Sequence, residues 1–243
     1  MSILLSLETS SEVCSAALHE NGRLLASTEL YMARSASSKL AVMVNDLLKL
    51  CNVPAVKIDG VVVSAGPGSY TGLRIGVATA KGLCFGLKIP LMAVNTLELM
   101  AFQVISAGFF SGEASPPSSE RSEMDVILCP MLDARRMEVY CLLTDLRLNI
   151  LELTAAKIID EESFNDWLAK GRIFFFGSGS AKCRGVIRDP RANFIDGIIP
   201  SASKLGELAF RKFEHKEFEE LLSFEPFYLK DFVVKTKRQN LML

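Results

Sequence analysis

Residues 60–76 have the sequence GVVVSAGPGSYTGLRIG, and this stretch decides the fold class. Its first six residues form a short β-branched run, which is typical of a central parallel strand. The strand leads into a glycine-rich loop at residues 66–72, and we expect a helix from there to about Leu87. A buried strand, a glycine turn and a helix in this order indicate an α/β protein.

The residues before this stretch predict an antiparallel meander. Strands are expected at residues 2–6, 13–18 and 24–30, and the last two are separated by Glu20-Asn21-Gly22, a good hairpin turn. An amphipathic helix over about residues 35–50 follows. Beyond the glycine loop, a strand at residues 90–94 and a helix from about Thr96 complete the first half.

The second half repeats this pattern. Strands are expected at residues 126–132, 138–143 and 173–176, and the last one enters a second glycine turn at residues 177–180. A helix over residues 201–213 follows. We therefore expect two lobes of related build. The predicted domains are a partner-binding N-terminal lobe at 1–105, a linker or loop at 106–123, a C-terminal lobe at 124–223 and a tail at 224–243.

Composition limits the classes of function. The chain has 243 residues, of which 49% are hydrophobic, so it is long and apolar enough for a compact globular protein. Its formal net charge is −1, which lacks the basic surplus of a protein that binds tRNA by itself. We therefore expect any nucleic-acid role to be indirect. No apolar run is long enough to cross a bilayer, and the expected location is cytoplasmic.

The cysteines and histidines predict neither a disulfide framework nor a metal site. The six cysteines lie far apart and form no C-x-x-C pair, which is typical of buried free thiols. The two histidines, His19 and His215, stand outside any ligand-like cluster. We expect both to have structural roles.

The glycine loop has two interpretations. Its three glycines would let the backbone approach an anion, with helix N–H groups directed at it. It lacks the Gly-Lys-Ser/Thr ending of a P-loop, and Thr71 stands where a dinucleotide fingerprint has its third glycine. The alternative is a tight turn that needs a positive φ. The helix that follows also contains several glycines, which predict close approach either to the chain's own sheet or to a partner helix.

Four motifs occur in one order along the chain and carry a resemblance to a known family. They are LETS at residues 7–10, GPGSYTGLRIG at 66–76, DARRMEVY at 133–140 and EPFYL at 225–229. The chain resembles the TsaB (YeaZ) family, a subunit of tRNA threonylcarbamoyladenosine biosynthesis. The resemblance implies the actin-like ATPase (ASKHA, ribonuclease H-like) fold, with two duplicated lobes that each have a mixed sheet and flanking helices. It also implies a complex with a catalytic TsaD-type paralogue and a small TsaE-type ATPase subunit.

Differences from the catalytic paralogue predict a non-catalytic scaffold. The paralogue has the motif V-N-H-x-E-x-H, whose two histidines bind its metal, whereas residues 94–100 here are VNTLELM. Thr96 and Met100 cannot replace these ligands, so we expect no catalytic residue and no metal. The first turn has Glu8 where actin-like kinases have aspartate, and no glycine precedes Cys14. Ala36 stands where relatives often have a histidine.

The resemblance also implies binding residues. ATP or ADP would bind only weakly or at a subunit interface, and the candidate nucleotide or phosphate residues are Thr9, Ser10, Gly66, Gly68, Gly177 and Gly179. The helices at 35–50 and 70–87 would pack against their counterparts in the paralogue, or against a second copy in a homodimer when the chain is alone. The expected interface residues are Leu40, Met43, Val44, Leu47, Gly72, Gly76 and Gly82. Contact with tRNA is expected only through the complex, and no membrane is expected.

Two other classes of function remain as alternatives. One is an active ATPase or phosphotransferase of the actin-like fold, which predicts a paired acid and glycine in the first turn. The other is a metallopeptidase, which predicts clustered histidines. The sequence has neither feature.

Overall fold

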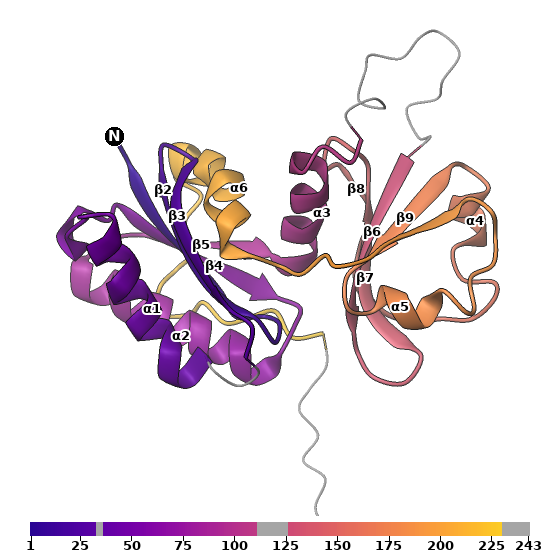
Figure 1. The fold of residues 1–243 in the computed structure, drawn as a ribbon, viewed down its shortest axis with the longest axis horizontal. Coiled ribbons are helices and arrows are strands. Elements are labelled where there is room, and N and C mark those ends of the chain that lie inside the picture. The colour runs from indigo at the N-terminus through magenta and orange to yellow at the C-terminus, as the bar shows by residue number, and fades with distance from the viewer. Residues whose placement is uncertain (33–35, 111–125, 230–243) are drawn as a thin grey trace, which may run out of the picture.

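The computed structural model describes residues 1–32, 36–110 and 126–229. These residues form two lobes, each built on a five-stranded sheet (Figure 1). The strands are β1 (Ile3–Glu8), β2 (Cys14–Glu20), β3 (Arg23–Leu30), β4 (Gly60–Gly66), β5 (Leu91–Asn95), β6 (Val126–Asp133), β7 (Glu138–Thr144), β8 (Ile150–Ile158), β9 (Arg172–Phe176) and β10 (Ala192–Ile195). The helices are α1 (Ala36–Leu50), η1 (Ala55–Lys57), α2 (Tyr70–Leu87), α3 (Thr96–Ser106), α4 (Asn165–Leu168), α5 (Ser180–Cys183) and α6 (Ala202–His215).

The two sheets have the same topology. The first has the strand order β3-β2-β1-β4-β5, and the second has β8-β7-β6-β9-β10. In each sheet the first three strands in sequence form an antiparallel meander. The fourth strand pairs in parallel with the first, and the fifth pairs in parallel with the fourth. This repeated mixed sheet is the ribonuclease H-like arrangement of actin-like ATPases, so the expected fold class is confirmed.

Helices cover both faces of the first sheet. The apolar face of α1 packs with α2 and with one face of the sheet, because residues such as Leu40 and Leu47 recur at helical spacing and are buried. On the opposite face, α6 packs through Leu205 and Ala209 against Leu4 and Val62. Figure 1 shows α1 and α2 on one side of the first sheet and α6 on the other.

Helix α6 packs on the first lobe, which corrects the assignment of all of residues 124–223 to the C-terminal lobe. The chain returns from β10 to the first sheet, where the N–H of Ala202 donates to Ser15 Oγ at 2.9 Å. His19 Nε2 lies 3.0 Å from the Ser203 carbonyl oxygen, and a Cβ at Gly206 would overlap the His19 ring. Close packing against β2 therefore draws this helix away from the lobe that precedes it in sequence.

Helix α3 joins the two lobes. Its residues Leu97, Met100 and Val104 are buried in a cluster with side chains of β6 and β7, whereas Leu99 packs with the first sheet. Asn95, which caps this helix, donates from Nδ2 to Thr154 Oγ1 of β8 at 2.9 Å. Figure 1 shows α3 between the sheets. A domain boundary at residue 105 therefore runs through packed structure.

Parts of two predicted segments lie outside the described residues, namely residues 111–123 of the linker and 230–243 of the tail. None of the described helices combines the length and the apolar character needed to cross a lipid bilayer.

Candidate functional site

The first turn, between β1 and β2, is buried under the start of α2. Thr9 is 1% exposed and Ser10 is 2% exposed. The hydroxyl of Thr9 donates to the Gly72 carbonyl oxygen at 2.8 Å, and the Ser10 carbonyl accepts from Ser69 N–H at 2.6 Å. The two side chains that we proposed as phosphate ligands are thus covered by the chain's own helix.

Glu8 is a buried carboxyl group beneath this turn. It accepts a hydrogen bond from the Ser10 N–H at 2.5 Å and another from the Ser64 hydroxyl. Burial raises its pKa to about 7, although the hydrogen bonds from Ser10 act in the opposite direction. Glu8 therefore carries a proton for part of the time at neutral pH, and it joins the first turn to β4.

The glycine loop is filled by protein on both sides. Gly66 has a φ of +110°, and a Cβ there would lie 2.6 Å from the Phe227 carbonyl oxygen. Phe227 also donates its N–H to the Ala65 carbonyl at 2.7 Å, so the segment before the tail crosses the loop. A Cβ at Gly68 would overlap the Ser10 backbone. These contacts favour the tight-turn interpretation, because only glycine permits both approaches.

The second glycine turn is packed in the same way. Gly177 has a φ of +95°, and a Cβ there would overlap Met100 of α3 and the Met131 carbonyl. A Cβ at Gly179 would lie 3.0 Å from the Leu132 carbonyl oxygen. The structure therefore gathers Thr9, Ser10, Gly66 and Gly68 around one turn of the first lobe, and places Gly177 and Gly179 in the second. Their predicted role in nucleotide binding stays a prediction.

Most of the expected interface residues face inward, which corrects the prediction. Leu40, Met43, Val44 and Leu47 are at most 9% exposed and lie in the core of the first lobe. A Cβ at Gly72 would overlap the Thr9 carbonyl, and one at Gly76 would overlap the Thr9 hydroxyl. These glycines serve the chain's own packing, because the first turn lies directly on α2.

The outer face of the same helices is exposed and partly apolar. A Cβ at Gly82 or Gly86 would meet no atom within 4 Å. Phe85, between them, is 75% exposed, and Val42 of α1 is 52% exposed. Sequence reasoning missed Val42 and Phe85, although each occupies a helix position opposite the buried face. Of the expected interface residues, only Gly82 lies on this surface.

The start of α3 contains the residues that replace metal ligands. Thr96 and Met100 are both fully buried. Thr96 Oγ1 has no hydrogen-bond partner among the described residues. Burial raises the pKa of Glu98, while nearby Lys212 acts to lower it. Among the residues that the structure describes, no group of three His, Cys, Asp or Glu side chains is placed to hold a metal ion.

Similarity to known proteins identifies the family. The family model of TsaD, tRNA N6-adenosine threonylcarbamoyltransferase, matches residues 30–236. The chain belongs to this family.

Within the family, the chain groups with the TsaB (YeaZ) proteins. The tRNA threonylcarbamoyladenosine biosynthesis protein TsaB of Bacillus subtilis is 29% identical, over 93% of each chain. TsaB of Haemophilus influenzae is 27% identical over 96% of each chain. The crystal structure of YeaZ from Pseudomonas aeruginosa superposes with a TM-score of 0.76 at 29% identity, covering 94% of this chain and 100% of that one.

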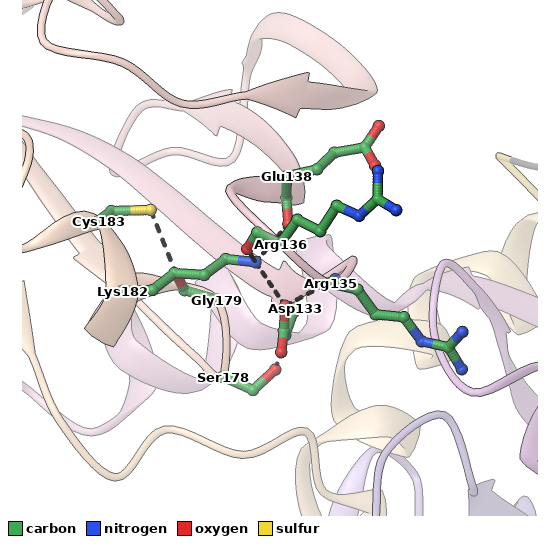
Figure 2. Close-up of polar contacts among 8 residues, drawn as sticks. All are labelled: Asp133, Arg135, Arg136, Glu138, Ser178, Gly179, Lys182 and Cys183. Atoms are coloured by element: carbon green, nitrogen blue, oxygen red, sulfur yellow. Dashed lines mark hydrogen bonds and ion pairs between the residues drawn. The ribbon is translucent and has the colours of Figure 1, made fainter.

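The TsaB motif at residues 133–140 forms a hairpin turn between β6 and β7, for which sequence reasoning proposed no role. Arg135 and Arg136 have φ values of +72° and +49°, a left-handed conformation that costs roughly 1 kcal/mol or more for each side chain other than glycine. Lys182 of α5 holds the turn by donating to Asp133 Oδ1 at 2.5 Å, to the Arg136 carbonyl at 2.8 Å and to the Glu138 carbonyl at 2.5 Å (Figure 2).

Asp133 is the acidic partner in this turn. Its carboxylate also accepts from the Arg135 N–H at 2.8 Å, and its own N–H donates to Ser178 Oγ at 3.1 Å. Partial burial acts to raise the pKa of Asp133, but the hydrogen bonds from Lys182 and Arg135 outweigh it and lower the pKa. The carboxyl group therefore stays ionised and paired with Lys182.

Proposed function

We propose that this chain is a non-catalytic subunit required for transfer of the threonylcarbamoyl group to adenosine of tRNA, and that it acts by dimerising with a TsaD-type catalytic paralogue. Membership of the TsaD family supports the reaction, and the similarity to TsaB proteins supports the subunit role. We propose the cytoplasm as the location of this tRNA-modifying role.

One observation carries the non-catalytic part of the proposal. Thr96 and Met100, at the positions of the paralogue's metal-binding histidines, are fully buried, and the Met100 methyl group packs against Gly177. A thioether in a dry core is a poor ligand for a catalytic ion, which also needs an open coordination position. The start of α3 thus serves here as an apolar joint between the lobes.

The outer face of α1 and α2 is the proposed contact with the paralogue. It combines exposed apolar side chains, Val42 and Phe85, with two glycines that let a partner helix approach closely. The paralogue would supply its own equivalent helices, and a second copy of this chain would take their place when the paralogue is absent. A small TsaE-type ATPase would join this pair, ATP or ADP would bind weakly or at a subunit interface, and tRNA would bind only to the complex.

The test is reconstitution of threonylcarbamoyl transfer to tRNA with and without this chain. We expect no product from this chain alone and full activity only when the catalytic paralogue is also present. The isolated chain should hydrolyse ATP at a rate well below about 1 per second, which is the low end of turnover numbers for enzymes. Transfer by this chain alone, or an unchanged rate when it is omitted, would refute the proposal.

The contact surface has its own test in Gly82→Leu. Because a side chain at residue 82 points into open space, the variant should keep the free energy of unfolding of the parent within about 1 kcal/mol. It should nevertheless lose association with the paralogue, since a leucine would hold the partner helix away. Size-exclusion chromatography of the mixture measures this, with Lys57→Leu on the exposed η1 helix as the control. A Gly82→Leu chain that associates normally would place the interface elsewhere.

A further inference from the structure

The β6–β7 turn holds two exposed arginines, Arg135 and Arg136, that form no ion pair among the described residues. The carboxylate of Asp133, two residues before Arg135, is occupied by Lys182. Figure 2 shows Lys182 reaching the turn from one side while both arginine side chains extend to the other.

Lys182 explains why this arrangement persists. Its ammonium group has three protons, and the three acceptors of the turn, Asp133 Oδ1 and two backbone carbonyls, take all of them. Without Lys182, the Asp133 carboxylate would be released and would be within a short reach of Arg135. Lys182 is therefore a positioning residue that keeps the Asp133 carboxylate from pairing with the Arg135 guanidinium group.

We propose that Arg135 and Arg136 bind backbone phosphates of RNA when the chain is part of the assembled complex. This inference rests on the proposed function, which it deepens by naming a contact with the tRNA substrate. A guanidinium group donates two parallel hydrogen bonds to a phosphate, and two neighbouring groups on an exposed turn suit neighbouring phosphates. The chain has a net charge of −1, so attraction to RNA has to come from local groups of this kind.

The surroundings of the arginines favour RNA over an acidic protein segment. Protein interfaces centre on buried aromatic or apolar anchors. Within this turn Ala134 and Met137 are half-buried, and no large apolar side chain between Asp133 and Glu138 is exposed. The turn thus offers charge without an apolar anchor, which is the chemistry of contact with a phosphate backbone.

The experiment measures the affinity of the assembled complex for a fluorescent tRNA at several salt concentrations. The variant is Arg135→Asn/Arg136→Asn, because asparagine tolerates the left-handed conformation and keeps the turn folded. We expect binding about tenfold weaker near physiological salt, and a slope of log K against log salt concentration that is smaller by about 2. Arg135→Lys/Arg136→Lys should recover most of the slope but not all of the affinity, since lysine is not bidentate.

The control removes the same charge elsewhere. Arg188 and Arg211 are exposed, one in the second lobe and one on α6, and Arg188→Asn/Arg211→Asn should leave affinity and slope unchanged. Lys182→Met should weaken binding by less than Arg135→Asn/Arg136→Asn but by more than Arg188→Asn/Arg211→Asn. Adding Asp133→Asn to Lys182→Met should restore part of the lost affinity. That rescue would not be seen if Lys182 were only a structural support.

Three results would overturn the proposal. Unchanged affinity and slope in the Arg135→Asn/Arg136→Asn complex would show a merely solvated turn. Loss of subunit assembly with normal tRNA affinity would assign the arginines to an acidic protein partner. An equal effect from the control pair would show general charge attraction. A parent complex that fails to modify tRNA would instead refute the proposed function, so the two failures are distinguishable.

Discussion

The β1–β2 turn of the first lobe and the β6–β7 turn of the second occupy the same place in the repeated topology, but they have opposite environments. The first is buried under α2, with Thr9 and Ser10 almost inaccessible. The second is exposed and is held from one side by Lys182. Duplication of a fold thus preserves the path of the backbone, while the neighbouring helix decides whether a turn is part of the core or part of the surface.

The neighbouring helices explain the difference. In the first lobe the turn packs against α2, an 18-residue helix whose glycines let it lie directly on Thr9. In the second lobe the equivalent position is taken by α5, a helix of four residues. A short helix covers little surface, and among the described residues Lys182 is the one side chain of α5 that forms hydrogen bonds to the turn.

The largest expected effect is that of Gly76→Leu. A side chain at residue 76 would overlap the Thr9 hydroxyl and force the first turn away from α2. We expect a loss of about 3 kcal/mol or more in the free energy of unfolding, because an overpacked core has no room to relax. Urea denaturation measures it, and Gly82→Leu is the matched control. Equal stability of the two variants would mean that the first turn does not depend on α2.

The second prediction concerns pH. The pKa of Glu8 is about 7 in the folded protein and ordinary in the unfolded chain, so the folded state binds the proton more tightly. This contribution to stability is fully present below about pH 4.5 and is lost as the pH rises through about 7, with a total of about 3 kcal/mol.

Glu8→Gln isolates this effect. The amide oxygen can still accept from the Ser10 N–H, and the amide NH2 can donate to Ser64 Oγ, but the side chain does not titrate. The difference in free energy of unfolding between parent and variant should therefore change between pH 5 and pH 8 in favour of the variant. Using the difference removes the contribution of His19, whose pKa is lowered by burial and which titrates in both proteins. A difference that is constant with pH would show that Glu8 is fully ionised in the fold.

The smallest expected effect is that of Lys182→Met on stability. Three hydrogen bonds are lost, but the Lys182 side chain is 21% exposed and water replaces part of them. We expect a loss of about 1–2 kcal/mol, measured by thermal unfolding. Lys204→Met, which breaks an exposed ion pair with Glu207, should cost less than about 0.5 kcal/mol. A Lys182→Met chain as stable as this control would show that the turn keeps its shape without the lysine.

The sequence predicted the elements with strong local signals. The antiparallel meanders, the strand before each glycine turn, and the helices α1, α2 and α6 all lie close to the predicted positions. Alternation of apolar residues, hairpin turns and helix caps are local properties, which explains this success. It missed β8 and β10. β8 is an edge strand whose Leu153 is 79% exposed, so it lacks the alternation of a half-buried strand, and β10 has only four residues.

The tertiary structure alone decided which face of each element is free. The periodicity of α1 correctly identified an apolar stripe, but it could not show that the first sheet, rather than a partner, covers that stripe. Gly72 and Gly76 are four residues apart, as are Gly82 and Gly86, yet a Cβ at either of the first two would overlap Thr9, whereas one at either of the last two would meet no atom within 4 Å. The sequence also could not predict that α6 packs against β2, because this depends on contacts between residues about 190 positions apart, such as Ser15 with Ala202. A sequence carries the apolar pattern of each element, whereas the partner of each face is chosen by packing among all of them.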